Sequence, residues 1–187
     1  MPRALDILIA ALALLVLSPL LLIAALAIKL GSRGPVIYRQ LRVGRDGREF
    51  EMLKLRTMEL GSDPVGVGTV VARDDPRVTR AGRLLRRTSL DEIPNLVNVL
   101  RGEMAIVGPR PTIPAQVEDY TPQQRRRHEV RPGITGWAQV QGRAGIPWEK
   151  RIELDVEYVD RRSTRLDLRI LAKTAWLLVT GHGLAPD

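Results

Sequence analysis

The first thirty residues are almost uniformly apolar, whereas the remainder of the chain mixes short apolar and polar stretches. Residues 7–28 form a run of 22 residues without a charge. At about 1.5 Å per residue, a helix over this run can cross a hydrocarbon core of ~30 Å. Ser18 and Pro19 lie in its middle, and a proline there removes a helical hydrogen bond and bends the helix. We expect two apolar arms, each about one leaflet deep.

Charges flank this run on both sides, with Arg3 before it and Lys29 and Arg33 after it. Cations at both ends suit a helix that dips into the bilayer and returns, so that both ends are cytoplasmic. A kinked helix that spans the bilayer fits these residues equally well. Residues 25–27 match a signal-peptide cleavage pattern, but the apolar run is longer than the roughly 7 to 15 residues of such peptides.

Two runs with strand-like alternation follow, over residues 36–43 and 49–56. Asp46 and Gly47 lie between them, and this pair is typical of hairpin turns. A β-hairpin is therefore expected directly after the apolar segment. Residues 61–68 are rich in glycine and predict turns.

Helix signals dominate the rest of the chain. Ser89, with Glu92 three positions later, predicts a capping box for an apolar helix that ends at Gly102. Thr121, with Gln124 three positions later, predicts the start of another short helix.

Two longer helices are expected near the C-terminus, over residues 147–160 and 166–180, the second ended by Gly181. The second is strongly apolar, but its length of ~21 Å is too short to span a bilayer. It fits a helix lying in the membrane interface, with Trp176 near the headgroups, and a buried core helix equally well.

Composition restricts the available chemistry. The formal net charge is +8, and arginine supplies most of the 29 cations, a bias that favours phosphate or carboxylate partners. Cysteine is absent, which excludes a disulfide framework, a thiolate nucleophile and Cys-ligated metals. Two histidines, His128 and His182, argue against a histidine-rich metal site. Any chemistry must use carboxylates, cations and hydroxyls.

Adjacent acids, Asp91 and Glu92, stand where the helix before Gly102 is expected to start. Acids in a first helical turn commonly serve only the cap and the helix dipole. Residues 108–111 (GPRP) add a stiff loop that presents Arg110, a side chain suited to phosphate. An aspartate with a pKa of about 4 is ionised at neutral pH, so it can act as a nucleophile without a base.

Further segments offer side chains to such a site. Lys54 and Arg56 fall on one side of the second strand by its two-residue period. Residues 133–142 include Gln139 and suit the wall of a base or sugar pocket, or equally a turn around a core tryptophan. The three arginines at residues 125–127 are interpreted as a surface feature, a contact with lipid headgroups or a complement to helix polarity, and not as catalytic residues.

Four features together resemble the bacterial sugar transferase family, the monotopic phosphoglycosyl transferases. They are the break at Ser18 and Pro19, KLRTM at residues 54–58, RRTSLDEIPNLVNVLRGEMAIVGPRP at residues 86–111, and RPGITGWAQVQGR at residues 131–143. The similarity covers about residues 1–181 and matches the small form of the family, a minimal catalytic core.

The resemblance implies transfer of a phosphosugar from a UDP-sugar to a polyprenol phosphate at the cytoplasmic face of the bacterial inner membrane, giving a polyprenol diphosphate sugar and UMP. Asp91 corresponds to the nucleophile, in contact with Mg²⁺, and Glu92 to its partner in the dyad. The expected substrate-binding residues are Lys54, Arg86, Arg110, Pro111 and Gln139.

The same resemblance favours the re-entrant form of the apolar segment. The expected fold class is α+β: a re-entrant membrane helix over residues 1–30, broken at Ser18 and Pro19, followed by a cytoplasmic catalytic domain over residues 31–187. That domain contains the hairpin and the helices, including amphipathic helices at the interface.

A net charge of +8 also fits a membrane-tethered module that binds anionic lipid or nucleic acid. Aromatic residues are few and no stacking motif is visible, so no nucleic-acid partner is expected. A structural membrane scaffold is a third alternative, and a homodimer is left open.

Overall fold

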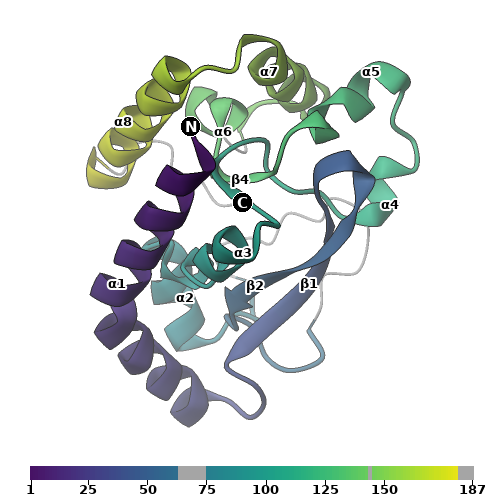
Figure 1. The fold of residues 1–187 in the computed structure, drawn as a ribbon. Coiled ribbons are helices and arrows are strands. Elements are labelled where there is room, and N and C mark those ends of the chain that lie inside the picture. The colour runs from purple at the N-terminus through teal and green to yellow at the C-terminus, as the bar shows by residue number, and fades with distance from the viewer. Residues whose placement is uncertain (63–74, 143–144, 181–187) are drawn as a thin grey trace.

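The computed structural model describes residues 1–62, 75–142 and 145–180 and combines helices with two-stranded sheets (Figure 1). The α+β class is confirmed at this level. The main core joins the first half of α1 (Arg3–Gly31) to α3 (Asn95–Arg101), β3 (Ala105–Val107) and α8 (Thr164–Thr180). Its buried members include Ala10, Phe50, Met52, Leu96, Val99, Met104, Ile106, Tyr158 and Ile170.

α1 continues through Pro19 as one helix of 29 residues. Proline cannot donate to the carbonyl four residues earlier, and the Ser18 hydroxyl donates to that Leu15 oxygen instead, at 2.8 Å. Figure 1 shows that the helix axis bends part-way along its length. The proline thus bends the helix without ending it.

Among the described residues, α1 is the helix that is long and apolar enough to cross a membrane, and only 11% of its most apolar window is buried. Its exposed large side chains are Ile7, Leu8, Leu12, Leu15, Val16, Leu20, Leu22, Ile23, Leu26 and Leu30. Most of this surface therefore has no packing partner in the described part of the protein.

Both arms of α1 contact the same body of the protein. In the first arm, Ala10 is fully buried in the main core, and the buried Asp6 carboxylate accepts a hydrogen bond from the backbone N–H of Ile106 at 3.1 Å. In the second arm, Ala24 and Ile28 pack in a cluster that includes Leu85. The helix therefore lies along one side of the domain (Figure 1).

The predicted hairpin is confirmed within one residue at each end. β1 (Ile37–Val43) pairs antiparallel with β2 (Glu49–Leu55), and Tyr38 lies opposite Lys54. The turn between them, η1 (Arg45–Gly47), holds Asp46 in the left-handed region at φ 57, a conformation that aspartate tolerates.

A second, parallel pair joins β3 to β4 (Gly133–Thr135). Its backbones touch because glycines leave room: a Cβ on Gly136 would lie 2.1 Å from the Gly108 carbonyl oxygen, and one on Gly133 would lie 2.1 Å from the Gly108 nitrogen. The start of the GPRP loop (residues 108–111) therefore packs directly against the backbone of the GITG segment (residues 133–136). β4 is not predicted by the sequence.

Helix starts were predicted with mixed success. The capping box at Ser89 is wrong: its side chain makes no cap bond, and α3 begins only at Asn95, after Pro94. α2 (Arg80–Arg87), capped by Thr79, lies in a segment for which no helix is predicted. The predicted end of α3 at Gly102 is confirmed, with that glycine in the left-handed region at φ 87.

The capping box of Thr121 and Gln124 is confirmed at the start of α5 (Pro122–Arg125). The other short helices between residues 114 and 141 are α4 (Pro114–Val117), η3 (Arg126–Glu129) and α6 (Trp137–Gln141).

The two C-terminal helices are confirmed as α7 (Trp148–Arg161) and α8. One side of α8 is buried through Asp167, Ile170 and Leu177. The other side exposes the large apolar side chains of Leu168, Trp176, Leu178 and Val179, so α8 is not a fully buried core helix and leaves an apolar surface uncovered. The expected helix end at Gly181, and the turn-rich loop from residue 63 to 68, lie outside the described residues.

Candidate active site

Three segments far apart in the sequence meet at the Glu92 carboxylate. Lys54 from β2 donates its Nζ to Oε1 at 2.9 Å, and Arg110 of the GPRP loop donates Nη2 to the same oxygen at 2.7 Å. Burial opposes ionisation of Glu92, yet the charges and hydrogen bonds of Arg110 and Lys54 outweigh it and lower the pKa of this carboxyl. Glu92 is thus an ionised anchor for two cations.

Asp91, next in the chain, is in a different state. Within the described residues its carboxylate makes no ion pair and accepts no hydrogen bond. Burial raises the pKa of Asp91 to about 6, and Glu92 adds to that rise, whereas Lys54, Arg86 and Arg110 oppose it. The expected pKa of about 4 is corrected upward, and the ionised carboxylate is still the main form at pH 7.

The turn before the acidic pair carries backbone strain. Ser89 has φ 56 and ψ 19, in the left-handed region, which costs a residue with a Cβ about 1–2 kcal/mol. It leads directly into η2 (Leu90–Glu92), the 3₁₀ turn that holds both acids. Such strain persists where the surroundings determine the conformation and is common at functional sites.

Arg86 reaches the site from the last turn of α2. Its Nε donates to the Thr57 hydroxyl at 2.9 Å, and its charge lowers the pKa of Asp91. α2 lies directly on the backbone of this segment, since a Cβ on Gly82 would be 2.0 Å from the Thr57 carbonyl oxygen. The KLRTM segment is therefore the support that orients Arg86.

Asn98 fixes Lys54 relative to Glu92. This fully buried side chain accepts a hydrogen bond from the Leu53 N–H at 3.0 Å and donates to the Glu51 carbonyl at 2.7 Å. It thereby ties α3, which follows the acids, to the edge of β2, which carries the lysine.

Arg127 holds the backbone of Arg110, the second cation paired with Glu92. Arg127 is only 3% exposed, so the surface interpretation of residues 125–127 is wrong for this member of the run. Its guanidinium pairs with the buried carboxylate of Asp155 and donates to the Arg110 carbonyl oxygen at 2.9 Å and to the Tyr120 hydroxyl at 2.8 Å. A buried arginine needs such partners.

Arg42 is a residue of the site region that sequence reasoning missed. It donates to the Pro111 carbonyl oxygen at 3.1 Å, and burial together with the Arg110 charge lowers its pKa to about 10, against opposing effects of Tyr38 and Glu92. The signal was present in the alternation of β1, because Arg42 is four positions from the direct cross-strand partner of Lys54.

The remaining expected residues have other contacts. Gln139 donates to the Ile134 carbonyl at 3.0 Å, within its own segment, and its buried Oε1 has no partner among the described residues. Arg56, just beyond β2, is buried and donates to the carbonyls of Ser32 and Arg33 at the end of α1. The structure thus brings together Lys54, Arg86, Asp91, Glu92, Arg110 and Pro111, and it shows no direct contact of Gln139 with them.

The described residues contain no cluster of three or more His, Cys, Asp or Glu side chains that would hold a metal by themselves. They do offer the Asp91 carboxylate beside cations. Mg²⁺ commonly binds through one or two carboxylates, with substrate phosphates as further ligands. This donor set fits that pattern and does not fit a dedicated protein cage.

The family described as bacterial sugar transferase matches residues 1–181. This chain belongs to the bacterial sugar transferase family. It is 47% identical over 162 residues to an uncharacterised sugar transferase, EpsL, of Bacillus subtilis, covering 87% of this chain and 78% of that protein. The resemblance inferred from the motifs is confirmed, and the chain is assigned to a family of transferases rather than to binding modules or scaffolds.

Two relatives have more informative names. The chain is 47% identical over 182 residues to UDP-glucose:undecaprenyl-phosphate glucose-1-phosphate transferase of Escherichia coli, covering 93% of this chain and 39% of that protein. It is 43% identical over 188 residues to UDP-N-acetylgalactosamine-undecaprenyl-phosphate N-acetylgalactosaminephosphotransferase of Aeromonas hydrophila, covering 97% of this chain and 44% of that protein. The chain spans less than half the length of these two relatives, whose names carry different sugars.

Proposed function

We propose that this protein transfers a sugar phosphate from a UDP-sugar to a membrane polyprenol phosphate, giving a polyprenol diphosphate sugar and UMP. The observation that carries the proposal is the contrast within the acidic pair. Glu92 is held by two cations, whereas Asp91 stays available beside them. The names of the relatives, which join a UDP-sugar to undecaprenyl phosphate, support the substrate classes.

In the first step, an Asp91 carboxylate oxygen attacks the phosphorus that bears the sugar. A bond forms from that oxygen to phosphorus, and the bond from phosphorus to the bridging oxygen breaks, with its electron pair leaving on UMP. The ionised carboxylate needs no base, and the leaving phosphate has a second pKa of about 6, so it departs without obligatory protonation. Among the described residues, no histidine hydrogen-bonds to Asp91 or Glu92, which fits this step.

Charge is the main obstacle, since a carboxylate must approach a diphosphate. Arg110, Lys54 and Arg86 already act on the Asp91 carboxylate electrostatically, so they are placed to stabilise the charge on the transferring phosphoryl group. Glu92 contributes by holding two of these cations in place. Its ionised state and its two donors make it a positioning residue and leave it no free proton to give.

Mg²⁺ fits this site as a cation held by Asp91 and by substrate phosphate oxygens. When bound, it would neutralise diphosphate charge and polarise the phosphoryl group. In the second step, a polyprenol phosphate oxygen attacks the phosphorus of the Asp91 acyl phosphate and forms the new diphosphate bond, while the bond from phosphorus to the Asp91 oxygen breaks and the carboxylate is regenerated. Direct transfer in a ternary complex, with Asp91 only as a metal ligand, is the rival route.

The membrane part of the proposal is a re-entrant α1 with both ends cytoplasmic. Both arms pack on the same domain, through Ala10 in one arm and Ile28 in the other. A spanning helix would carry one arm away from that domain to the opposite leaflet. A half-depth helix keeps the site near the lipid headgroups, where the phosphate of a polyprenol lies.

The test is UMP release by the full chain in detergent, measured against a panel of UDP-sugars with and without polyprenol phosphate. The proposal expects sustained release that needs Mg²⁺, polyprenol phosphate and one preferred sugar, and that Asp91→Asn abolishes. No release with any UDP-sugar, or equal release by Asp91→Asn, would reject the proposed function.

A further inference from the structure

A pocket of about 450 Å³ opens where α6, α7 and the first turns of α8 meet. It is lined by three arginines, Arg161, Arg165 and Arg169, together with Glu157, Trp137 and Leu166. It shares no lining residue with the carboxylate pair and its cations, so the reaction proposed above leaves it without a role.

Glu157, the one acid among the described residues that line this pocket, is already engaged. Glu157 accepts a hydrogen bond from the Trp137 indole N–H at 3.2 Å on one oxygen and from Arg161 at 2.5 Å on the other. In the described part of the chain, Arg165 and Arg169 form no ion pair. Like charges this close repel each other, so an anion bound between them is stabilising.

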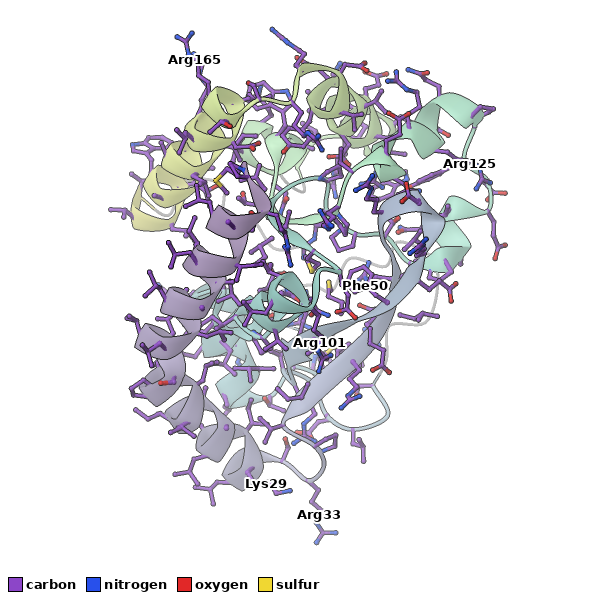
Figure 2. All side chains as sticks on the ribbon, in the orientation of Figure 1. Lys29, Arg33, Phe50, Arg101, Arg125 and Arg165 are labelled. Atoms are coloured by element: carbon purple, nitrogen blue, oxygen red, sulfur yellow. The ribbon has the colours of Figure 1, made fainter. Side chains whose placement is uncertain are left out.

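The pocket lies level with the start of the apolar segment. The Met1 amino group contacts the Asp167 carboxylate, two residues from each of the free arginines, and Arg3 precedes the uncharged run. Figure 1 shows α8 beside the first half of α1, and Figure 2 shows Arg165 projecting outward at the start of α8. A bilayer that receives α1 therefore has its headgroups near these arginines.

An apolar stripe leads away from the pocket along α8. By the period of about 3.6 residues, Leu168, Ala172 and Trp176 lie on the same exposed side as Arg165, and all are exposed. From Arg165 to Trp176 the helix advances ~16 Å at about 1.5 Å per residue, about the depth of one leaflet. Cations at one end and apolar residues along the rest match a lipid in shape and charge.

We propose that this pocket binds the phosphate of an anionic glycerophospholipid, with the acyl chains along the exposed side of α8. The proposal rests on the membrane docking of the proposed function, but the lipid is neither substrate nor product of that reaction. Arg165 and Arg169 bind the phosphate, and Trp137 and Leu166 form the wall towards the hydrocarbon.

The experiment uses the full chain in detergent and short-chain dihexanoyl phosphatidylglycerol as the probe, followed by tryptophan fluorescence. Trp137 lines the pocket and Trp176 lies on the stripe, so occupancy changes their emission. We expect a saturable change that Arg165→Gln/Arg169→Gln weakens at least tenfold. The matched control, Arg45→Gln/Arg48→Gln in the exposed hairpin turn, removes the same charge elsewhere and is expected to leave the affinity unchanged.

Three outcomes would overturn the proposal. Equal affinity for dihexanoyl phosphatidylcholine would mean that the pocket does not select for the net negative charge of the lipid. Equal affinity for inorganic phosphate would assign the site to free anions. Equal weakening by both double variants would mean attraction by net charge alone. UMP release by the same samples is scored separately, so failure of the transferase proposal and failure of the lipid pocket are distinguishable.

Discussion

Arg127 donates its Nη2 to the carbonyl oxygen of Arg110 at 2.9 Å, from a position buried inside the domain. The cation proposed to meet the substrate is thus held by a second arginine that never reaches the site. A buried guanidinium of this kind acts on the reaction only through the backbone that it positions.

Loss of Arg127 is predicted to slow transfer through misplacement of Arg110. Arg127→Gln alone leaves Asp155 buried and unpaired, a loss of about 3–5 kcal/mol of stability, so the informative variant is Arg127→Gln/Asp155→Asn. It should fold, and its turnover should fall about ten- to a hundredfold, as expected for a displaced positioning group. The measurement is the kcat for UMP release, with circular dichroism of the same sample.

The matched control is Arg126→Gln, next in the chain but half-buried and paired with the exposed acids Glu129 and Asp160. Its activity should change little, because exposed ion pairs contribute at most about 1 kcal/mol. Turnover of the double variant equal to that of the unchanged protein would show that the Arg110 backbone needs no such support.

Glu92→Gln tests whether the second acid positions cations. Its carboxylate holds Lys54 and Arg110, and hydrogen bonds to charged groups contribute about 1.5–3 kcal/mol each. We expect turnover to fall about ten- to a hundredfold while the first UMP released per enzyme without acceptor is retained. Glu51→Gln, on the same strand as Lys54 but paired at the surface with Arg39, is the control. Complete loss of the first turnover in Glu92→Gln would contradict a role limited to positioning.

The sequence predicted those parts of the site that depend on local signals. The hairpin, the end of α3 at Gly102 and the cap at Thr121 each follow from residues adjacent in the chain. The capping box predicted at Ser89 does not form because Glu92 makes tertiary contacts. Its carboxylate pairs with Lys54 and Arg110 and does not accept a hydrogen bond from the Ser89 backbone N–H.

The roles of Arg127 and Arg42 depend on contacts across long sequence separations, and a local pattern does not contain these contacts. Arg127 lies in a run of three arginines, and only the fold puts Asp155 beside it. The raised pKa of Asp91 likewise depends on the tertiary fold, because burial is its main cause.

His128 is predicted to make stability depend on pH. Burial, with the charges of Arg127 and Arg125, lowers its pKa to about 4, whereas an unfolded histidine has a pKa of about 6.5. Between these values the unfolded chain binds more protons, so this group reduces the free energy of unfolding as pH falls from about 6.5 to about 4.

His128→Gln removes that titration. On acidification, the free energy of unfolding should therefore fall more for the unchanged protein than for the variant. Denaturant unfolding of both at about pH 7 and about pH 4.5 measures it. Comparison of the two chains cancels the carboxyl groups. Two curves that stay parallel across this interval would contradict the burial of a neutral histidine.

The topology of α1 can be read by thiol labelling, because the chain has no cysteine. Single cysteines at Ala4 and Arg33 flank the apolar helix, and one at Leu15, which is 71% exposed, marks its middle. The re-entrant form predicts that a membrane-impermeant maleimide labels the first two only from the cytoplasmic side and labels Leu15→Cys from neither side. Labelling of Ala4→Cys and Arg33→Cys from opposite sides would establish a spanning helix.

The central claim is a phosphosugar bond to Asp91, and the most direct measurement is mass spectrometry of the protein quenched after mixing with its UDP-sugar and Mg²⁺, without polyprenol phosphate. The account predicts one phosphosugar on the tryptic peptide of residues 88–101, one UMP released per enzyme, and loss of both in Asp91→Asn. An unmodified peptide with no UMP until the lipid acceptor is added would contradict it and establish direct transfer.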